Sequence, residues 1–146
     1  MELNEILKPS AVRVVGNLSR KKRLFQDLGE LAAASYDIEL SRAVEALQER
    51  EALGPTGVGQ GVALPHARID GLEEVVGLFL LIEKPMDYDS IDRQPVDLVF
   101  ALFAPEDAGV DHLKALALVS RTLRDSAVCA KLRSNTDPTI LHAVLT

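Results

Sequence analysis

The sequence predicts an α/β protein, a three-layer sandwich in which helices flank both faces of a mixed β-sheet. Two nearly continuous apolar runs, Val75–Ile82 and Val96–Ala104, are typical of strands that are covered on both faces. Segments before and after them repeat apolar residues every three or four positions, as amphipathic helices do. A length of 146 residues suits one domain, which we expect to span residues 1–146.

The first half of the chain predicts a strand, two helices and a loop. Val12–Val15 is expected to be a short strand, with a turn at Gly16-Asn17. Ser19 is expected to cap a helix whose apolar residues recur at helical spacing, namely Leu24, Leu28, Leu31 and Ala32. A second helix should follow Asp37 and run to about Glu51, with one apolar side formed by Leu40, Ala43, Val44 and Leu47.

The second half predicts the remaining strands and three further helices. Residues 62–64 read as a short strand that enters Pro65-His66. Asp111 is expected to cap a helix with one apolar side, formed by Leu113, Leu116, Ala117 and Leu123. A short helix at 127–132 and a last one opened by Asp137-Pro138 complete the chain. Cys129 and His142 are interpreted as structural residues within these helices.

Composition restricts the class of partner. Sixteen basic and 22 acidic residues give a net charge of −6, the wrong sign for a nucleic-acid-binding domain. A single cysteine, no signal-like start and no apolar run of membrane-spanning length favour a cytoplasmic protein without membrane insertion. Four consecutive cations, Arg20 to Arg23, form either a solvated helix edge or a docking patch for an acidic protein or membrane surface.

The segment from Gly54 to Arg68 carries the most chemical information. Its four glycines, Gly54, Gly57, Gly59 and Gly61, allow sharp turns and could present peptide N–H groups to an anion. Pro65 favours an extended approach to His66, whose imidazole is partly neutral and nucleophilic at pH 7. A glycine-rich turn with an incidental histidine explains the residues equally well. No nucleotide-binding motif is present, so a phosphoryl group on His66 would have to come from another protein.

A resemblance to a known family follows from these residues. Between Arg50 and His66 the pattern Arg-Glu-x-Leu-Gly-x-Thr-Gly-x-Gly-x-Gly-x-Ala-x-Pro-His resembles the signature of the enzyme IIA components of the bacterial phosphotransferase system, in the fructose/mannitol class. Pro95–Leu102 and His112-Leu113 extend the likeness over nearly the whole chain. Residues 19–33 are similar to the nitrogen-related branch of this class.

The resemblance implies roles for particular residues. His66 would accept phosphate at Nε2 from a small histidine phosphocarrier, with His112 and Arg50 beside it. Thr56, Gly57, Gly59, Gly61 and Arg68 would complete a phosphate-binding site, and neither cofactor nor metal is implied. The nitrogen-related branch implies a regulator that binds cytoplasmic proteins, such as potassium-transport or sensor-kinase components, according to its phosphorylation.

Several alternatives stay open at this point. The chain could be a sugar-specific IIA protein that passes phosphate to a IIB domain for fructose or mannitol. A metal site built on His66 and His112 is weaker, because catalytic zinc takes three protein ligands. Asp87, Asp89 and Asp92 lack the spacing of a calcium loop and are interpreted as a polar loop. Val58, Val62 and Leu64 are expected to form an apolar docking face, on a monomer or a homodimer.

Overall fold

A computed structural model describes all residues from 1 to 146. Its helices are α1 (Leu3–Ile6), α2 (Lys21–Tyr36), α3 (Leu40–Ala52), α4 (Val110–Arg124), α5 (Ser126–Arg133) and α6 (Pro138–Leu145), with a 3-10 turn η1 at Pro9–Ala11. Its strands are β1 (Val12–Val15), β2 (Gly57–Gly59), β3 (Val62–Ala63), β4 (His66–Ile69), β5 (Val76–Met86) and β6 (Val96–Pro105). The predicted strands and helices occur in the expected order, and α1, η1, β2 and β4 are elements that the sequence did not predict.

The six strands form one mixed sheet in the order β1-β5-β6-β3-β2, and β4 also pairs with β6. The two long apolar strands, β5 and β6, run antiparallel at the centre. β1 is parallel to β5, and β3 and β4 are parallel to β6. The two predicted apolar runs are therefore the two long strands at the centre of the sheet, and the shorter strands β1, β3 and β4 pair with them.

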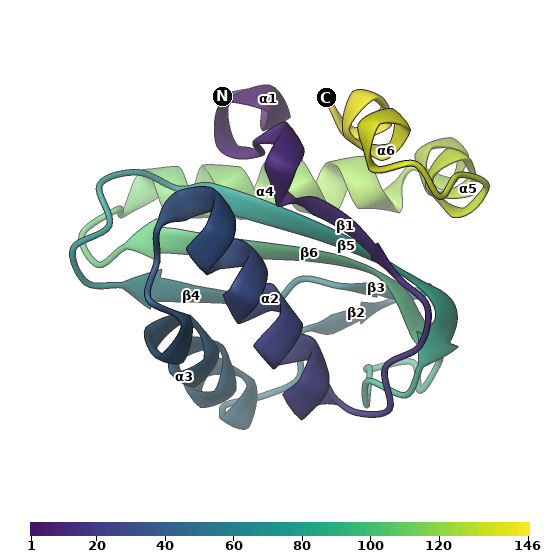
Figure 1. The fold of residues 1–146 in the computed structure, drawn as a ribbon, viewed down its shortest axis with the longest axis horizontal. Helices are drawn as coiled ribbons and strands as arrows, with labels where there is room; N and C mark the ends of the chain where they lie inside the picture. The colour runs from purple at the N-terminus through teal and green to yellow at the C-terminus, as the bar shows by residue number, and fades with distance from the viewer.

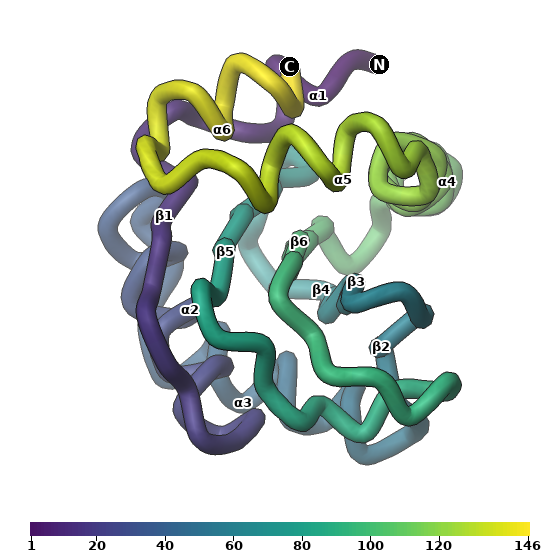
Figure 2. Tube along the Cα trace, turned by 90° about the vertical axis from the view of Figure 1, so that its right-hand side faces the viewer, coloured from purple at the N-terminus to yellow at the C-terminus, as the bar shows by residue number.

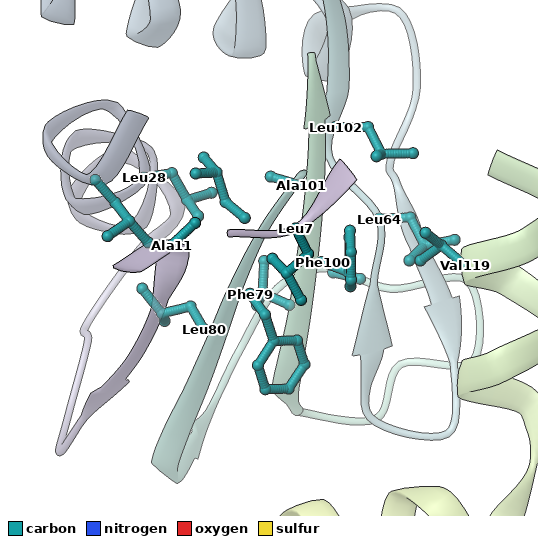
Figure 3. Close-up of a cluster of buried hydrophobic side chains, with 14 of the residues drawn as sticks. Leu7, Ala11, Leu28, Leu64, Phe79, Leu80, Phe100, Ala101, Leu102 and Val119 are labelled. Carbon is teal, nitrogen blue, oxygen red and sulfur yellow. The ribbon is translucent and has the colours of Figure 1, made fainter. Parts of the chain in front are cut away.

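Helices cover both faces of this sheet, which confirms the predicted three-layer sandwich (Figures 1 and 2). α2 packs against β5 and α3 against β4, whereas α4 packs against β6 and α6 against β1. Buried apolar side chains from strands and helices fill the space between the layers, and Leu28, Phe79, Phe100 and Val119 are among them (Figure 3). The rings of Phe79 and Phe100 lie 6.2 Å apart between centroids.

Two predicted helix caps are wrong by one or two residues. The N-cap of α2 is Arg20 rather than Ser19, and the N-cap of α4 is Gly109 rather than Asp111. Neither observed cap forms a side-chain hydrogen bond, so a search for capping side chains misses both. Asp111 lies inside the first turn of α4, where a carboxylate still interacts favourably with the helix dipole.

The strand that carries His66 is interrupted, which corrects the expectation that His66 follows a strand end. β3 and β4 pair with β6 in one constant register, Val62 with Leu98 and His66 with Leu102. Between them the Leu64 amide donates to the carbonyl of Thr56 instead of to β6, at 2.9 Å, and Pro65 has no N–H to offer. His66 is therefore the first residue of a resumed strand, held by hydrogen bonds on the same partner.

Candidate functional site

A single hydrogen bond orients the ring of His66. Its Nδ1 lies 2.8 Å from the carbonyl oxygen of Leu64, two residues earlier. Because a carbonyl can only accept, Nδ1 carries the proton and Nε2 keeps its lone pair. Burial lowers the pKa of His66, and the charge of Arg50 lowers it further against the opposing effects of the Leu64 carbonyl and Glu51. The side chain is thus a neutral imidazole with a free Nε2.

His112 lies against His66, as the resemblance implied. The two ring centroids are 5.6 Å apart and the planes meet at 71°. His112 is buried, at 7% exposure, and its Nε2 has no hydrogen-bond partner. Burial lowers the pKa of His112, with smaller contributions from His66 and Arg68. The sequence predicted this direction from the helix start, whereas its causes are burial and neighbouring positive charge.

Two arginines border the histidine pair. Arg50, in the last turn of α3, donates a hydrogen bond to the carbonyl oxygen of Gly54 at 3.0 Å. Arg68, two residues along β4 from His66, lies on the same face of the strand and donates to the carbonyl oxygen of Glu106 at 2.6 Å. Each guanidinium keeps further N–H donors beyond these contacts.

The glycine-rich segment forms a tight hairpin rather than an open loop. β2 and β3 pair antiparallel, and Gln60 and Gly61 between them both have positive φ, as a type I′ turn requires. A Cβ on Gly57 would collide with Ser90, and a Cβ on Gly61 would meet Arg133 and Asp97. Close packing and turn geometry therefore explain these glycines. Their role in binding phosphate, with that of Gly59, stays a prediction.

A buried polar network beside the site was missed by the sequence reasoning. The Glu51 carboxylate pairs with Lys21 Nζ at 2.8 Å and accepts from the amide and hydroxyl of Thr56. The Thr56 hydroxyl also lies 2.8 Å from the Tyr88 hydroxyl. Burial opposes ionisation of Glu51, but the hydrogen bonds from Lys21 and Thr56 outweigh it and lower its pKa. The hydroxyl of Thr56 is thus already engaged within the protein.

No local signal could have revealed this network, because Lys21 and Glu51 are 30 residues apart. The basic cluster is accordingly only partly a solvated edge: Lys21 pairs inward, and Arg23 contacts Asp27 at 3.3 Å.

The predicted docking face is wrong in two of three residues. Val58 is 46% exposed, but Val62 is buried because β3 lies between β2 and β6. Leu64, which follows β3, is also buried in the core (Figure 3).

Three lesser interpretations can be compared with the structure. Cys129 is buried and contacts the carbonyl of Leu123, and His142 contacts the carbonyl of Leu7 at 2.9 Å, so both are structural as predicted. Asp92 accepts hydrogen bonds from the amides of Gln60 and Gln94. No three His, Cys, Asp or Glu side chains gather with metal-binding geometry. None of the helices combines the length and apolar character that crossing a membrane requires.

Two solved structures place the fold of this chain in the class of phosphotransferase-system IIA folds. A nitrogen regulatory IIA protein from Neisseria meningitidis has 34% identity, covers 98% of both chains and superimposes with a TM-score of 0.89. The mannitol IIA protein of Escherichia coli, at 19% identity over 95% of this chain and 98% of that one, shares the fold with a TM-score of 0.80.

The chain belongs to the family described as "Phosphoenolpyruvate-dependent sugar phosphotransferase system, EIIA 2", whose model matches residues 5–146. A nitrogen regulatory protein of Bradyrhizobium diazoefficiens is 43% identical over 145 residues, which cover 99% of this chain and 95% of that protein. A nitrogen regulatory protein of Escherichia coli (strain K12) is 35% identical over 100% of this chain and 90% of its own length. The resemblance seen in the sequence is confirmed.

Proposed function

We propose that His66 accepts a phosphoryl group at Nε2 from a phosphorylated histidine carrier protein. The observation that supports this most directly is the hydrogen bond from Nδ1–H to the Leu64 carbonyl, which leaves Nε2 unprotonated and nucleophilic. In the transfer, Nε2 forms a bond to phosphorus while the bond to the donor histidine nitrogen breaks, so the donor ring regains its lone pair. No proton has to leave His66.

The neighbouring side chains suit the charge that this step brings. A phosphoryl group on His66 adds nearly two negative charges. The unpartnered Nε2 of His112 could then donate to a phosphoryl oxygen, which relieves a buried polar atom that otherwise has no partner. Arg50 and Arg68 would contribute positive charge and N–H donors. Phosphoryl transfer depends mainly on such positioning and charge compensation.

The assignment is tested by intact-mass measurement after mixing the protein with phosphoenolpyruvate, enzyme I and the phosphocarrier. We expect the wild-type protein to gain one phosphate and H66A to gain none. H142A is the matched control, because His142 is the remaining histidine outside the pair, and it should still be phosphorylated. A phosphorylated H66A would overturn the proposal.

We further propose that the protein is a cytoplasmic, single-domain regulator whose partners change with the phosphorylation of His66. The nitrogen regulatory relatives, at 34–43% identity, support this over the sugar-carrying alternative. Deleting the gene should leave growth on fructose and mannitol unchanged and alter responses to potassium or nitrogen. Rapid transfer from phosphorylated His66 to a fructose or mannitol IIB domain, with loss of sugar uptake in the deletion strain, would favour a sugar relay instead.

A further inference from the structure

A cleft on the molecule is separate from the histidine pair. This cleft, of about 840 Å³, lies between the last turn of α2, the start of α3, α1 and the turn that joins β4 to β5. A smaller cleft of about 360 Å³ adjoins it and shares Glu5, Ile6, Glu73, Glu74 and Val75. We refer to the two together as the acidic groove.

Negative charge is concentrated in this groove. The larger cleft contributes six carboxylates: Glu5, Asp37, Glu39, Asp70, Glu73 and Glu74. The smaller one adds Asp107 and Asp111, and the only basic side chains along the groove are Lys8 and Arg42. These eight acidic and two basic side chains carry a formal charge of −6. The rest of the chain holds 14 acidic and 14 basic residues, so the groove accounts for the whole net charge.

The carboxylates of the groove have no basic partners. The salt bridges of the protein join Lys21 to Glu51, Arg23 to Asp27 and Arg133 to Asp97, all elsewhere. Lys8 is turned to other contacts, because its Nζ donates to the Ser35 carbonyl at 3.1 Å and lies over the Tyr36 ring. Arg42 is therefore the one remaining basic side chain, and a cationic ligand would find most of the negative charge uncompensated.

The floor of the groove is apolar and firmly held. It is formed by side chains that belong to the buried core, namely Ile6, Ile38, Ile69, Val75 and Val76. The Tyr36 hydroxyl lies 3.0 Å from the carbonyl oxygen of Ile6 and 2.8 Å from that of Gly77, which ties α2 to both α1 and β5. The groove thus offers acidic walls around an apolar floor without any rearrangement.

We propose that the acidic groove binds a lysine- or arginine-rich amphipathic segment of a partner protein. Such a segment matches both features, since its cations would meet the walls and its apolar side chains the floor. A single metal ion would leave the apolar floor unused, and no three side chains here have metal-binding geometry. Ile69, on the floor, follows His66 by three residues of β4, about 10 Å along the strand. Side chains three residues apart on a strand point to opposite faces, so the groove is a site distinct from the phosphoacceptor.

The test uses a fluorescein-labelled peptide of repeated Lys-Leu-Ala-Lys units, about four helical turns long. Its affinity is measured by fluorescence anisotropy, and its position by amide chemical-shift changes in the full-length protein. E73Q/E74Q removes two groove charges, and E30Q/E83Q removes two exposed charges elsewhere as the matched control. We expect E73Q/E74Q to bind about threefold to tenfold more weakly than the control pair. Raising the salt from about 0.05 to 0.3 M should weaken binding as well.

Each of the following outcomes would contradict the proposal. Equal affinities of the two double variants, or chemical-shift changes outside the groove, would show non-specific attraction to an acidic protein. Equal occupancy of the groove by spermidine or Mg²⁺ would indicate a small-cation site. A concentration-dependent dimer abolished by E73Q/E74Q would indicate a second copy of this chain. Repeating the titration with H66A separates this proposal from the phosphoacceptor assignment, because peptide binding requires no phosphate.

Discussion

At His66, one hydrogen bond decides which ring nitrogen can react. The Leu64 carbonyl that orients the ring is available because β3 gives way to β4 at Leu64-Pro65. The ring centroids of His66 and His112 are 5.6 Å apart. The His66 ring, with its unprotonated Nε2, therefore lies beside a buried His112 whose Nε2 has no hydrogen-bond partner. The chemistry of the site thus depends on tautomer and spacing as much as on residue type.

Removing either neighbouring donor should slow phosphoryl exchange and leave His66 as the acceptor. For R50A and H112A we expect rates about 10²–10³-fold lower, the usual cost of losing one donor to a developing charge. Rapid mixing with phosphorylated carrier measures the rate, and intact mass confirms that one phosphate is still acquired. R121A, at an exposed position in the last turn of α4, is the control with an arginine removed elsewhere. Wild-type rates in R50A and H112A would exclude both from the phosphate site.

The lowered pKa values of His66 and His112 predict the pH dependence of stability. Between those values and the ordinary histidine pKa near 6.5, the unfolded chain binds more protons than the folded one. Stability therefore falls as the pH drops through this window and is regained above it. Urea unfolding at about pH 7 and 5.5 should show a smaller loss for H66A/H112A than for the wild type. Equal losses would mean that the pair does not titrate below its ordinary range.

At the scale of elements, the β2–β3 hairpin joins the site to the rest of the fold. Glu51 at the end of α3 accepts a hydrogen bond from the Thr56 amide just before the hairpin, and Ser90 packs directly against Gly57. The sequence indicated a glycine-rich loop that could bind an anion here, whereas the structure shows a hairpin turn packed on distant residues. Such packing depends on contacts between residues more than 30 apart, which local patterns do not record.

Gly57 should tolerate no side chain. In G57A the new Cβ would approach Ser90 too closely, 2.9 Å from its backbone Cα, so neither partner can move away cheaply. We expect a loss of about 1–3 kcal/mol in the free energy of unfolding. G16A is the control, since nothing lies within 4 Å of its added Cβ. Urea midpoints compare the two, and an unchanged midpoint for G57A would contradict the packing argument.

The first turn of α2 carries charge of the unfavourable sign. It begins Lys21-Lys22-Arg23 and contains no acidic residue, although a helix N-terminus favours negative charge. Lys22 is exposed, so K22E should stabilise the protein by about 0.3–1 kcal/mol at low salt. The same change at exposed Lys131, in the last turn of α5, should have the opposite sign. Urea unfolding measures both, and shifts of equal sign would rule out a dipole effect.

For the whole molecule, the sequence predicted the architecture better than the site. Uninterrupted apolar runs identified β5 and β6, and helical periodicity identified the helices that cover them. The motif brought His66, His112 and Arg50 to attention, and the structure places the two histidines together. The caps without side-chain bonds, the buried Val62 and Leu64, and the Glu51 network could not be predicted, because each depends on tertiary packing.

The position of α2 gives the molecule an electrical orientation. The helix is about 24 Å long and runs from Arg20–Arg23 at one end to the acidic groove at the other. Its peptide dipoles point in the same sense as these side-chain charges, so the two add instead of cancelling. A charged partner therefore exerts a torque on the protein before any contact is made. The protein is therefore pre-oriented as it approaches a charged partner, and fewer of their diffusive encounters bring unproductive faces together.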